Sequence, residues 1–256
     1  MLYSSSPEGY ALLQKMWPLC LGLLIFFVAF HSTSTGKLSS SSLSLSASKP
    51  APLFQVAVLH GYHSNARSLE MYLSNLQHEL SDCANFTFLN APHESLESLL
   101  SKSTKRSKRK YSWASPVGGY VDSLKLLKRA NQELQGGIDV CIGHSQGGCM
   151  LAAILANQQQ QEEIFPNLKL SIFLSAFYPL REDTNPLIKA KSLHIWGSDD
   201  MVVDPALSED LKSRFDDARE VVREGGGHDP PRCDRSTKAM TEAIRQLMNQ
   251  KVEIIV

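Results

Sequence analysis

The chain has 256 residues, of which 43% are hydrophobic, and its 26 basic residues balance its 26 acidic residues. This length allows one domain with a sizeable core, and the net charge of zero gives no overall attraction to nucleic acid. The sequence contains no phosphate-binding loop, dinucleotide fingerprint or H-E-x-x-H pattern, so it implies neither a metal nor an organic cofactor.

The first fifty residues differ in composition from the rest of the chain. Residues 16–30 are mostly apolar and follow Lys15, which is typical of a signal-peptide core, with an uncleaved membrane anchor as the alternative. Residues 31–48 are rich in Ser and Thr without an acidic residue, which predicts disorder and is compatible with a transit peptide. We therefore expect a leader or anchor with a Ser-rich segment over residues 1–50 and a folded domain over residues 51–256. Such a segment predicts that the chain enters the secretory route or is anchored in a membrane. An apolar run followed by a Ser-rich segment also fits the two-part leader of a complex-plastid protein.

The folded domain is predicted to begin with a strand over residues 54–59, followed by His60, Gly61 and Tyr62. Apolar residues at helical spacing predict a helix over residues 68–80, and the same spacing recurs in the last helix at Met240, Ile244 and Leu247. Because strand-like and helix-like runs alternate, we expect a mainly parallel sheet with helices on both faces.

One charge cluster lies between these elements, with six Lys or Arg residues among the nine residues 102–110. Such runs are most often solvated loops. A sharper hypothesis is that this basic loop, or the N-terminal segment, contacts a membrane surface through acidic headgroups.

The stretch Gly143-His144-Ser145-Gln146-Gly147 follows an apolar, strand-like run over residues 138–142 and precedes a helix-forming run. A serine in a G-x-S-x-G turn between a strand and a helix is typical of a nucleophile elbow. The flanking glycines allow the tight turn, and the helix N-terminus behind the serine offers backbone N–H groups to a developing negative charge. We therefore predict Ser145 as a nucleophile.

A serine nucleophile needs a histidine base and an orienting carboxylate. Strand-like residues 193–196 lead into a loop that contains Asp199, Asp200 and Asp204, of which we prefer Asp200 on spacing. A short strand over residues 219–222 leads into a glycine-rich loop that carries His228. The chain order Ser145, Asp200, His228 is the order of the α/β-hydrolases.

An oxyanion hole would complete this machinery. The backbone N–H of Gln146, the residue after the nucleophile, is the first expected donor. The loop after the first strand supplies the second, and we predict the backbone N–H of Tyr62. His60 is more typical of a hydrogen-bonded structural residue than of a base or a metal ligand.

Several motifs taken in order resemble the FSH-type serine hydrolases, from about residue 53 to about residue 248. They comprise Leu59-His60-Gly61-Tyr62 with Asn65 and Ala66, Asn90-Ala91-Pro92, Trp113, residues 143–147, Ser175-Ala176-Phe177, Gly197 with Asp200, and Gly226-Gly227-His228. The resemblance implies an α/β-hydrolase domain without a large separate cap that acts on carboxylic esters or thioesters, and it supports Asp200 as the acid. His144 departs from the pattern, because Phe or Tyr is frequent at that position.

Two questions stay open from the sequence. Trp113 and Phe177 are plausible walls of a substrate pocket, but core packing explains them nearly as well. The competing function is a receptor that binds a ligand on the hydrolase fold without hydrolysing it, because a fold alone does not fix a function.

Overall fold

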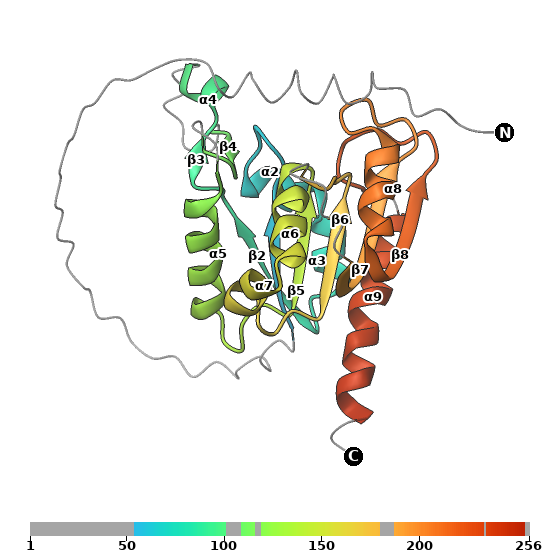
Figure 1. The fold of residues 1–256 in the computed structure, drawn as a ribbon. Helices are drawn as coiled ribbons and strands as arrows, with labels where there is room; N and C mark the ends of the chain where they lie inside the picture. Colours follow the sequence, from blue (N-terminus) through green and yellow to red (C-terminus); the bar gives the residue numbers. More distant parts are fainter. Residues whose placement is uncertain (1–53, 101–108, 116–118, 180–186, 233, 254–256) are drawn as a thin grey trace, which may run out of the picture. The chain divides into compact units, whose positions relative to one another are not determined.

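The computed structural model describes residues 54–100, 109–115, 119–179, 187–232 and 234–253 (Figure 1). The predicted leader over residues 1–50 and most of the basic segment lie outside these residues. Among the helices of the described residues, none combines the length and the apolar character that crossing a bilayer requires.

A six-stranded parallel sheet forms the centre of the described residues (Figure 1). Its strand order is β2-β1-β5-β6-β7-β8, and each neighbouring pair runs parallel. The strands are β1 (Phe54–Leu59), β2 (Ala84–Leu89), β5 (Val140–His144), β6 (Leu170–Leu174), β7 (Ile188–Gly197) and β8 (Phe215–Arg223). The alternation of strand-like and helix-like runs predicted this mainly parallel sheet.

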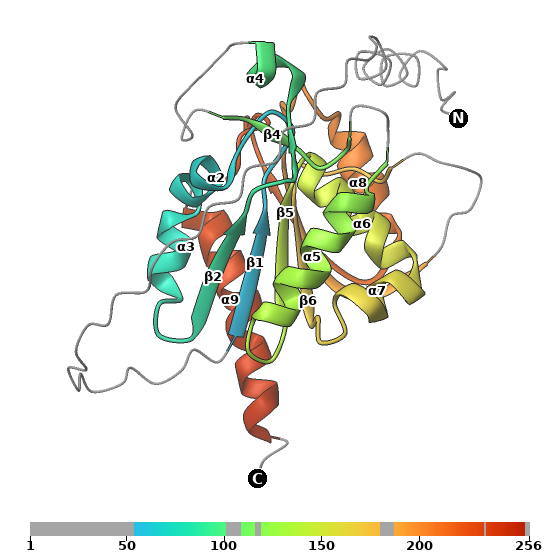
Figure 2. The same cartoon turned by 90° about the vertical axis from the view of Figure 1, so that its left-hand side faces the viewer.

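Helices cover both faces of this sheet (Figure 2). One face carries α2 (Ala66–Tyr72), α3 (Ser74–Glu79) and α9 (Asp234–Glu253), and the other carries α5 (Val121–Glu133), α6 (Gln146–Ala156), α7 (Gln158–Ile164) and α8 (Pro205–Ser213). Alternation along β1 shows why both faces are buried. Val56 and Val58 point into the cluster under α2, α3 and α9, whereas Ala57 and Leu59 point into the cluster under α5 to α8.

The helix predicted over residues 68–80 is interrupted. Asn65 caps α2 by accepting the N–H of Ser68 at 2.9 Å, and the chain leaves helical geometry at Leu73 before α3 begins. Leu69, Leu73 and Leu76 are nevertheless all buried. The apolar spacing therefore predicted the buried face correctly but not the break. The predicted buried positions of α9 at Met240, Ile244 and Leu247 are confirmed.

A small addition lies at the C-terminal end of the sheet strands (Figures 1 and 2). It consists of β3 (His93–Glu94), α4 (Leu96–Leu100) and β4 (Tyr111–Ser112), with β3 and β4 antiparallel. The described residues hold no large separate cap. Because sites in open parallel sheets form at this end, the addition lies where it can shape one.

A buried histidine in β7 makes the fold sensitive to acid. The ring of His194 stacks on Phe173 with 4.7 Å between centroids and meets Phe215 edge-on at 5.1 Å. Burial is the main cause that lowers its pKa from 6.5 to about 3, and Lys212 lowers it further. Below about pH 6.5 the unfolded chain binds a proton that the folded protein excludes until about pH 3, so the free energy of unfolding falls as the pH drops through this window.

We expect the substitution His194→Phe to weaken this loss of stability. Phenylalanine retains the ring contacts and removes the titrating group, so denaturant unfolding at about pH 7 and about pH 5 should differ less than in the wild type. The exposed His78 provides the control variant His78→Gln, whose pH dependence should match the wild type. An unchanged pH dependence in His194→Phe would contradict the role of this residue.

Candidate active site

Ser145 lies in the turn between β5 and α6, where it is the N-cap of the helix. Its φ of 49° and ψ of −117° lie outside the regions that L-residues ordinarily adopt, and the residue is 8% exposed. Its N–H donates to the carbonyl oxygen of Leu174 in β6 at 2.9 Å, which ties the turn to the next strand. A strained, non-glycine residue held in this way is typical of a functional position.

The glycines around Ser145 are required by close backbone contacts. A Cβ atom on Gly143 would overlap the Cα of Gly148, and one on Gly147 would overlap the carbonyl oxygen of Leu59. The turn therefore brings the first helical turn against the ends of β5 and β1, which places Ser145 at the C-terminal edge of the sheet. This is the strand, turn and helix arrangement that the G-x-S-x-G stretch predicted.

Asp200 and His228 form a hydrogen-bonded pair. His228 Nδ1 lies 2.8 Å from Asp200 Oδ2 and 3.1 Å from Oδ1, and the Asp200 side chain is fully buried. Asp200 Oδ1 also accepts the N–H groups of Val202 and Val203, each at 2.9 Å. Burial by itself raises the pKa of this carboxyl, but the bonds from Val203, His228 and Val202 outweigh it and lower the pKa below 3.8. The carboxylate is therefore ionised and oriented toward the imidazole.

The two neighbouring aspartates have other contacts. Asp199 is exposed and accepts a hydrogen bond from Ser198 Oγ at 2.8 Å. Asp204 caps α8 by accepting the N–H of Ala206 at 2.9 Å. Of the three, Asp200 contacts His228, which is the residue that the sequence spacing favoured.

The loop of His228 lies against the residue that precedes Ser145. His144 Nε2 is 2.9 Å from the backbone carbonyl oxygen of His228, and the two rings are 5.0 Å apart between centroids. The loop after β1 meets the same point, since a Cβ on Gly61 would lie 3.2 Å from the Cβ of Ser145. One edge of the sheet thus brings together three segments. They are the turn at Ser145, the loop of Gly61 and Tyr62, and the loops that carry Asp200 and His228.

Comparison with known proteins identifies the family of this chain. The profile of the family described as serine hydrolase (FSH1) matches residues 52–240, which is well over half of the chain. The chain belongs to the serine hydrolase (FSH1) family. This agrees with the family that the ordered motifs resemble.

Individual proteins that resemble this chain are named as esterases or thioesterases. Over 216 residues the hydrolase is 24% identical to Esterase C25G4.2 of Caenorhabditis elegans, covering 79% of this chain and 97% of the relative. Among solved structures, esterase PE8 has a TM-score of 0.59 at 23% identity, with 77% and 94% of the two chains covered. Acyl-protein thioesterase 2 of Zea mays has a TM-score of 0.56 at 16% identity, with 77% and 95% covered. At these identities the solved structures support the α/β-hydrolase fold.

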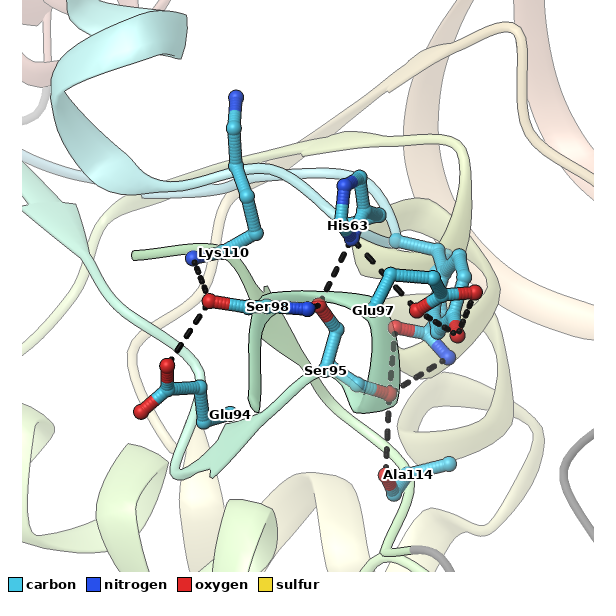
Figure 3. A network of polar contacts seen from close by, with 10 residues as sticks. His63, Glu94, Ser95, Glu97, Ser98, Lys110 and Ala114 are labelled. Atoms are coloured by element: carbon cyan, nitrogen blue, oxygen red, sulfur yellow. Dashed lines mark hydrogen bonds and ion pairs between the residues drawn. The ribbon is translucent and has the colours of Figure 1, made fainter. Parts of the chain in front are cut away.

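Contacts that the sequence did not predict hold the Tyr62 loop of the hydrolase in place (Figure 3). Tyr62 is 39% exposed, and its hydroxyl donates to the Glu97 carboxylate of α4 at 3.0 and 3.2 Å. His63, at a φ of 49°, lies with Nδ1 2.7 Å from Ser95 Oγ and 3.6 Å from Glu97 Oε2. These contacts join the loop after β1 to α4, which is distant in sequence.

The α4 segment is itself fixed by hydrogen bonds (Figure 3). Ser98 Oγ donates to Glu94 Oε1 at 2.8 Å and accepts the Lys110 N–H at 3.1 Å. Residues of β3, α4 and β4 therefore form one connected unit above the sheet edge. No spacing motif marks these residues, so nothing in the sequence pointed to them.

Trp113, which the sequence proposed as a pocket wall, is fully buried. Its indole Nε1–H donates to the His60 carbonyl at 2.7 Å, and its backbone N–H donates to Gln146 Oε1 at 2.9 Å. These contacts are those of a packed core residue, which was one of the two interpretations that the sequence left open. Phe177 is half-buried and lies three residues after the end of β6.

His60 has a structural role, as expected. It is fully buried, its Nε2 accepts the Ala91 N–H at 3.0 Å, and its Nδ1 is 2.7 Å from the Gly61 carbonyl. Burial is the main cause that lowers the pKa of His60 from 6.5 to about 4. Across the part of the chain that the structure describes, no three His, Cys, Asp or Glu side chains are grouped so as to hold a metal ion.

Proposed function

We propose that this hydrolase cleaves carboxylic esters or thioesters through an acyl-enzyme on Ser145, with His228 as base and Asp200 as its orienting acid. The observation that carries this proposal is the contact between His228 and the buried Asp200 side chain, together with the His228 loop, which lies against the residue next to the strained Ser145. A serine, a histidine and a carboxylate in these roles form the arrangement that activates a hydroxyl for acyl transfer.

In the proposed reaction, His228 Nε2 accepts the Ser145 hydroxyl proton as Oγ attacks the acyl carbon. Asp200 stabilises the resulting imidazolium, and the backbone N–H groups of Tyr62 and Gln146 donate to the oxyanion. The tetrahedral intermediate collapses when His228 returns the proton to the departing alcohol or thiol. Water, deprotonated by His228, then attacks the acyl-enzyme and releases the carboxylic acid with regeneration of the Ser145 hydroxyl.

The Asp200 contacts favour this division of roles. A carboxylate with two backbone N–H donors stays ionised, and its bond to Nδ1 leaves the Nε2 of His228 available to Ser145. Phe177, which keeps exposed surface near the end of β6, is our proposed wall for the acyl group.

Two measurements test the function. A fluorophosphonate probe should label wild-type protein at Ser145, identified by mass spectrometry of the labelled peptide. A panel of esters and thioesters that share acyl chains of stepped length should show turnover, and the ratio between matched pairs should assign the leaving-group preference. Tight binding of the panel compounds with negligible turnover and no labelling would instead indicate the ligand-binding receptor.

We also propose that residues 1–50 direct the chain into the secretory route, either as a cleaved leader or as an anchor. The apolar run over residues 16–30 and the Ser-rich segment after it support this proposal. A fluorescent protein fused behind residues 1–50 should colocalise with a marker of the endoplasmic reticulum, a later secretory compartment or a plastid. The same fluorescent protein fused behind residues 51–100 is the control, and cytosolic fluorescence from both fusions would reject the proposal.

A further inference from the structure

His144 lies between the two loops that supply the proposed base and the proposed oxyanion donor. It is 9% exposed and ends β5 directly before Ser145. On one side its Nε2 is 2.9 Å from the His228 carbonyl oxygen. On the other side, a Cβ on Gly61 would lie 2.9 Å from His144 Nδ1, so the ring fills the space that this glycine leaves.

The contact with His228 fixes the protonation of the imidazole. A carbonyl oxygen accepts but cannot donate, so the Nε2 of His144 must carry the hydrogen and Nδ1 of the neutral ring must be free of one. Burial is the main cause that lowers the pKa of His144 to about 4, so the ring is neutral near pH 7. His144 therefore donates to the backbone of His228 throughout the neutral range.

The loop that carries His228 also accepts hydrogen bonds from a second side chain, that of Arg223. Arg223 Nη2 donates to the carbonyl oxygens of Gly227 at 2.6 Å and Asp229 at 2.9 Å. With His144, three successive carbonyl groups of the loop each accept a hydrogen bond from a side chain. The His144 bond is the one directed at His228 itself, and it comes from the residue adjacent to the nucleophile.

The geometry points to His144 as a positioning residue that sets the distance between Ser145 and the His228 imidazole by holding the His228 backbone against the end of β5. This inference rests on the proposed function of the two residues that it connects. A phenyl ring at residue 144 can fill the same space but offers no donor to the His228 carbonyl. The histidine thus gives this chain a connection that a phenyl ring at residue 144 would not supply.

The decisive test compares His144→Phe with His144→Gln. Glutamine carries its amide N–H about as far from the backbone as the imidazole Nε2, so it can donate to the same carbonyl. We expect His144→Phe to lower kcat for an ester by about 10- to 100-fold with KM nearly unchanged, because small displacements of reacting groups reduce rates by such factors. His144→Gln should recover most of the kcat, and both variants should unfold cooperatively.

The matched control replaces another buried histidine by phenylalanine away from this edge. His194→Phe should keep the wild-type kcat at about pH 7, because the contacts of His194 are with Ser192, Phe173 and Phe215. A kcat of His144→Phe within about twofold of wild type would overturn the inference, as would equal losses in the folded Phe and Gln variants.

A measurement on wild-type protein remains if the Phe variant does not fold. Nitrogen-15 NMR of the histidine side chains should show His144 in the Nε2–H form, and a Nδ1–H form would contradict the bond to His228. This result does not depend on turnover. Absence of both Ser145 labelling and turnover in the wild type would defeat the proposed function, whereas an active wild type with an unaffected His144→Phe would defeat only this inference.

Discussion

Replacing Ser145 with alanine should lower kcat for ester hydrolysis by about 10⁴-fold or more. The strained turn holds Ser145 at the sheet edge, where the Gly61 loop lies against Ser145 and the His228 loop lies against His144. Alanine removes the oxygen atom that would form the acyl-enzyme. The remaining activity would come from binding and from the oxyanion donors alone. Steady-state kinetics on the best ester of the panel, with loss of fluorophosphonate labelling, provide the measurement.

Ser171 offers a matched control for this substitution. It is a buried serine of β6, and its hydroxyl has no hydrogen-bond partner among the described residues. Ser171→Ala should therefore leave kcat within a few-fold of wild type. Ester hydrolysis by Ser145→Ala at a rate near that of wild type would exclude Ser145 as the nucleophile.

The substitution Asp200→Asn should have the next largest effect, a decrease in kcat of about 10³- to 10⁴-fold. Asparagine is nearly isosteric, but it removes the charge that stabilises the His228 imidazolium and presents an amide where Nδ1 requires an acceptor. The buried position of the Asp200 side chain strengthens this effect, because little water screens the pair.

Asp199→Asn is the matched control, since Asp199 precedes Asp200 in the same loop and is exposed. We expect its kcat to stay within a few-fold of wild type, because its side chain bonds Ser198 rather than His228. Measured side by side under identical conditions, a larger loss from Asp199→Asn than from Asp200→Asn would reverse our assignment of the acid.

The elements that carry these residues could be predicted because their signals are local. Apolar runs followed within two residues by a glycine marked β1, β5 and the core of β7, and the G-x-S-x-G stretch marked the turn before α6. Elements with a weaker pattern were predicted less completely. Only two β-branched residues, Val221 and Val222, indicated β8, which spans Phe215–Arg223 because its backbone pairs with β7 over most of that length.

Contacts between distant segments could not be predicted in the same way. The Trp113 indole meets a carbonyl 53 residues earlier in the chain, and the Tyr62 hydroxyl meets a carboxylate 35 residues later. The local sequence around Trp113 is compatible with a pocket wall and, nearly as well, with a core residue. Its burial depends on how the β4 segment folds against the end of β1, which no periodic pattern records.

The sequence by itself determined the chemistry available to this protein: a serine in a glycine-flanked turn, then an acid, then a histidine, in α/β-hydrolase order. Each signal depends on a few adjacent residues and on backbone constraints that act over one turn. Only the tertiary structure decided which aspartate meets His228, that Trp113 is buried, and that His144 connects two loops. These outcomes depend on side chains from separate strands converging at one sheet edge, because packing and hydrogen-bond geometry act through space rather than along the chain.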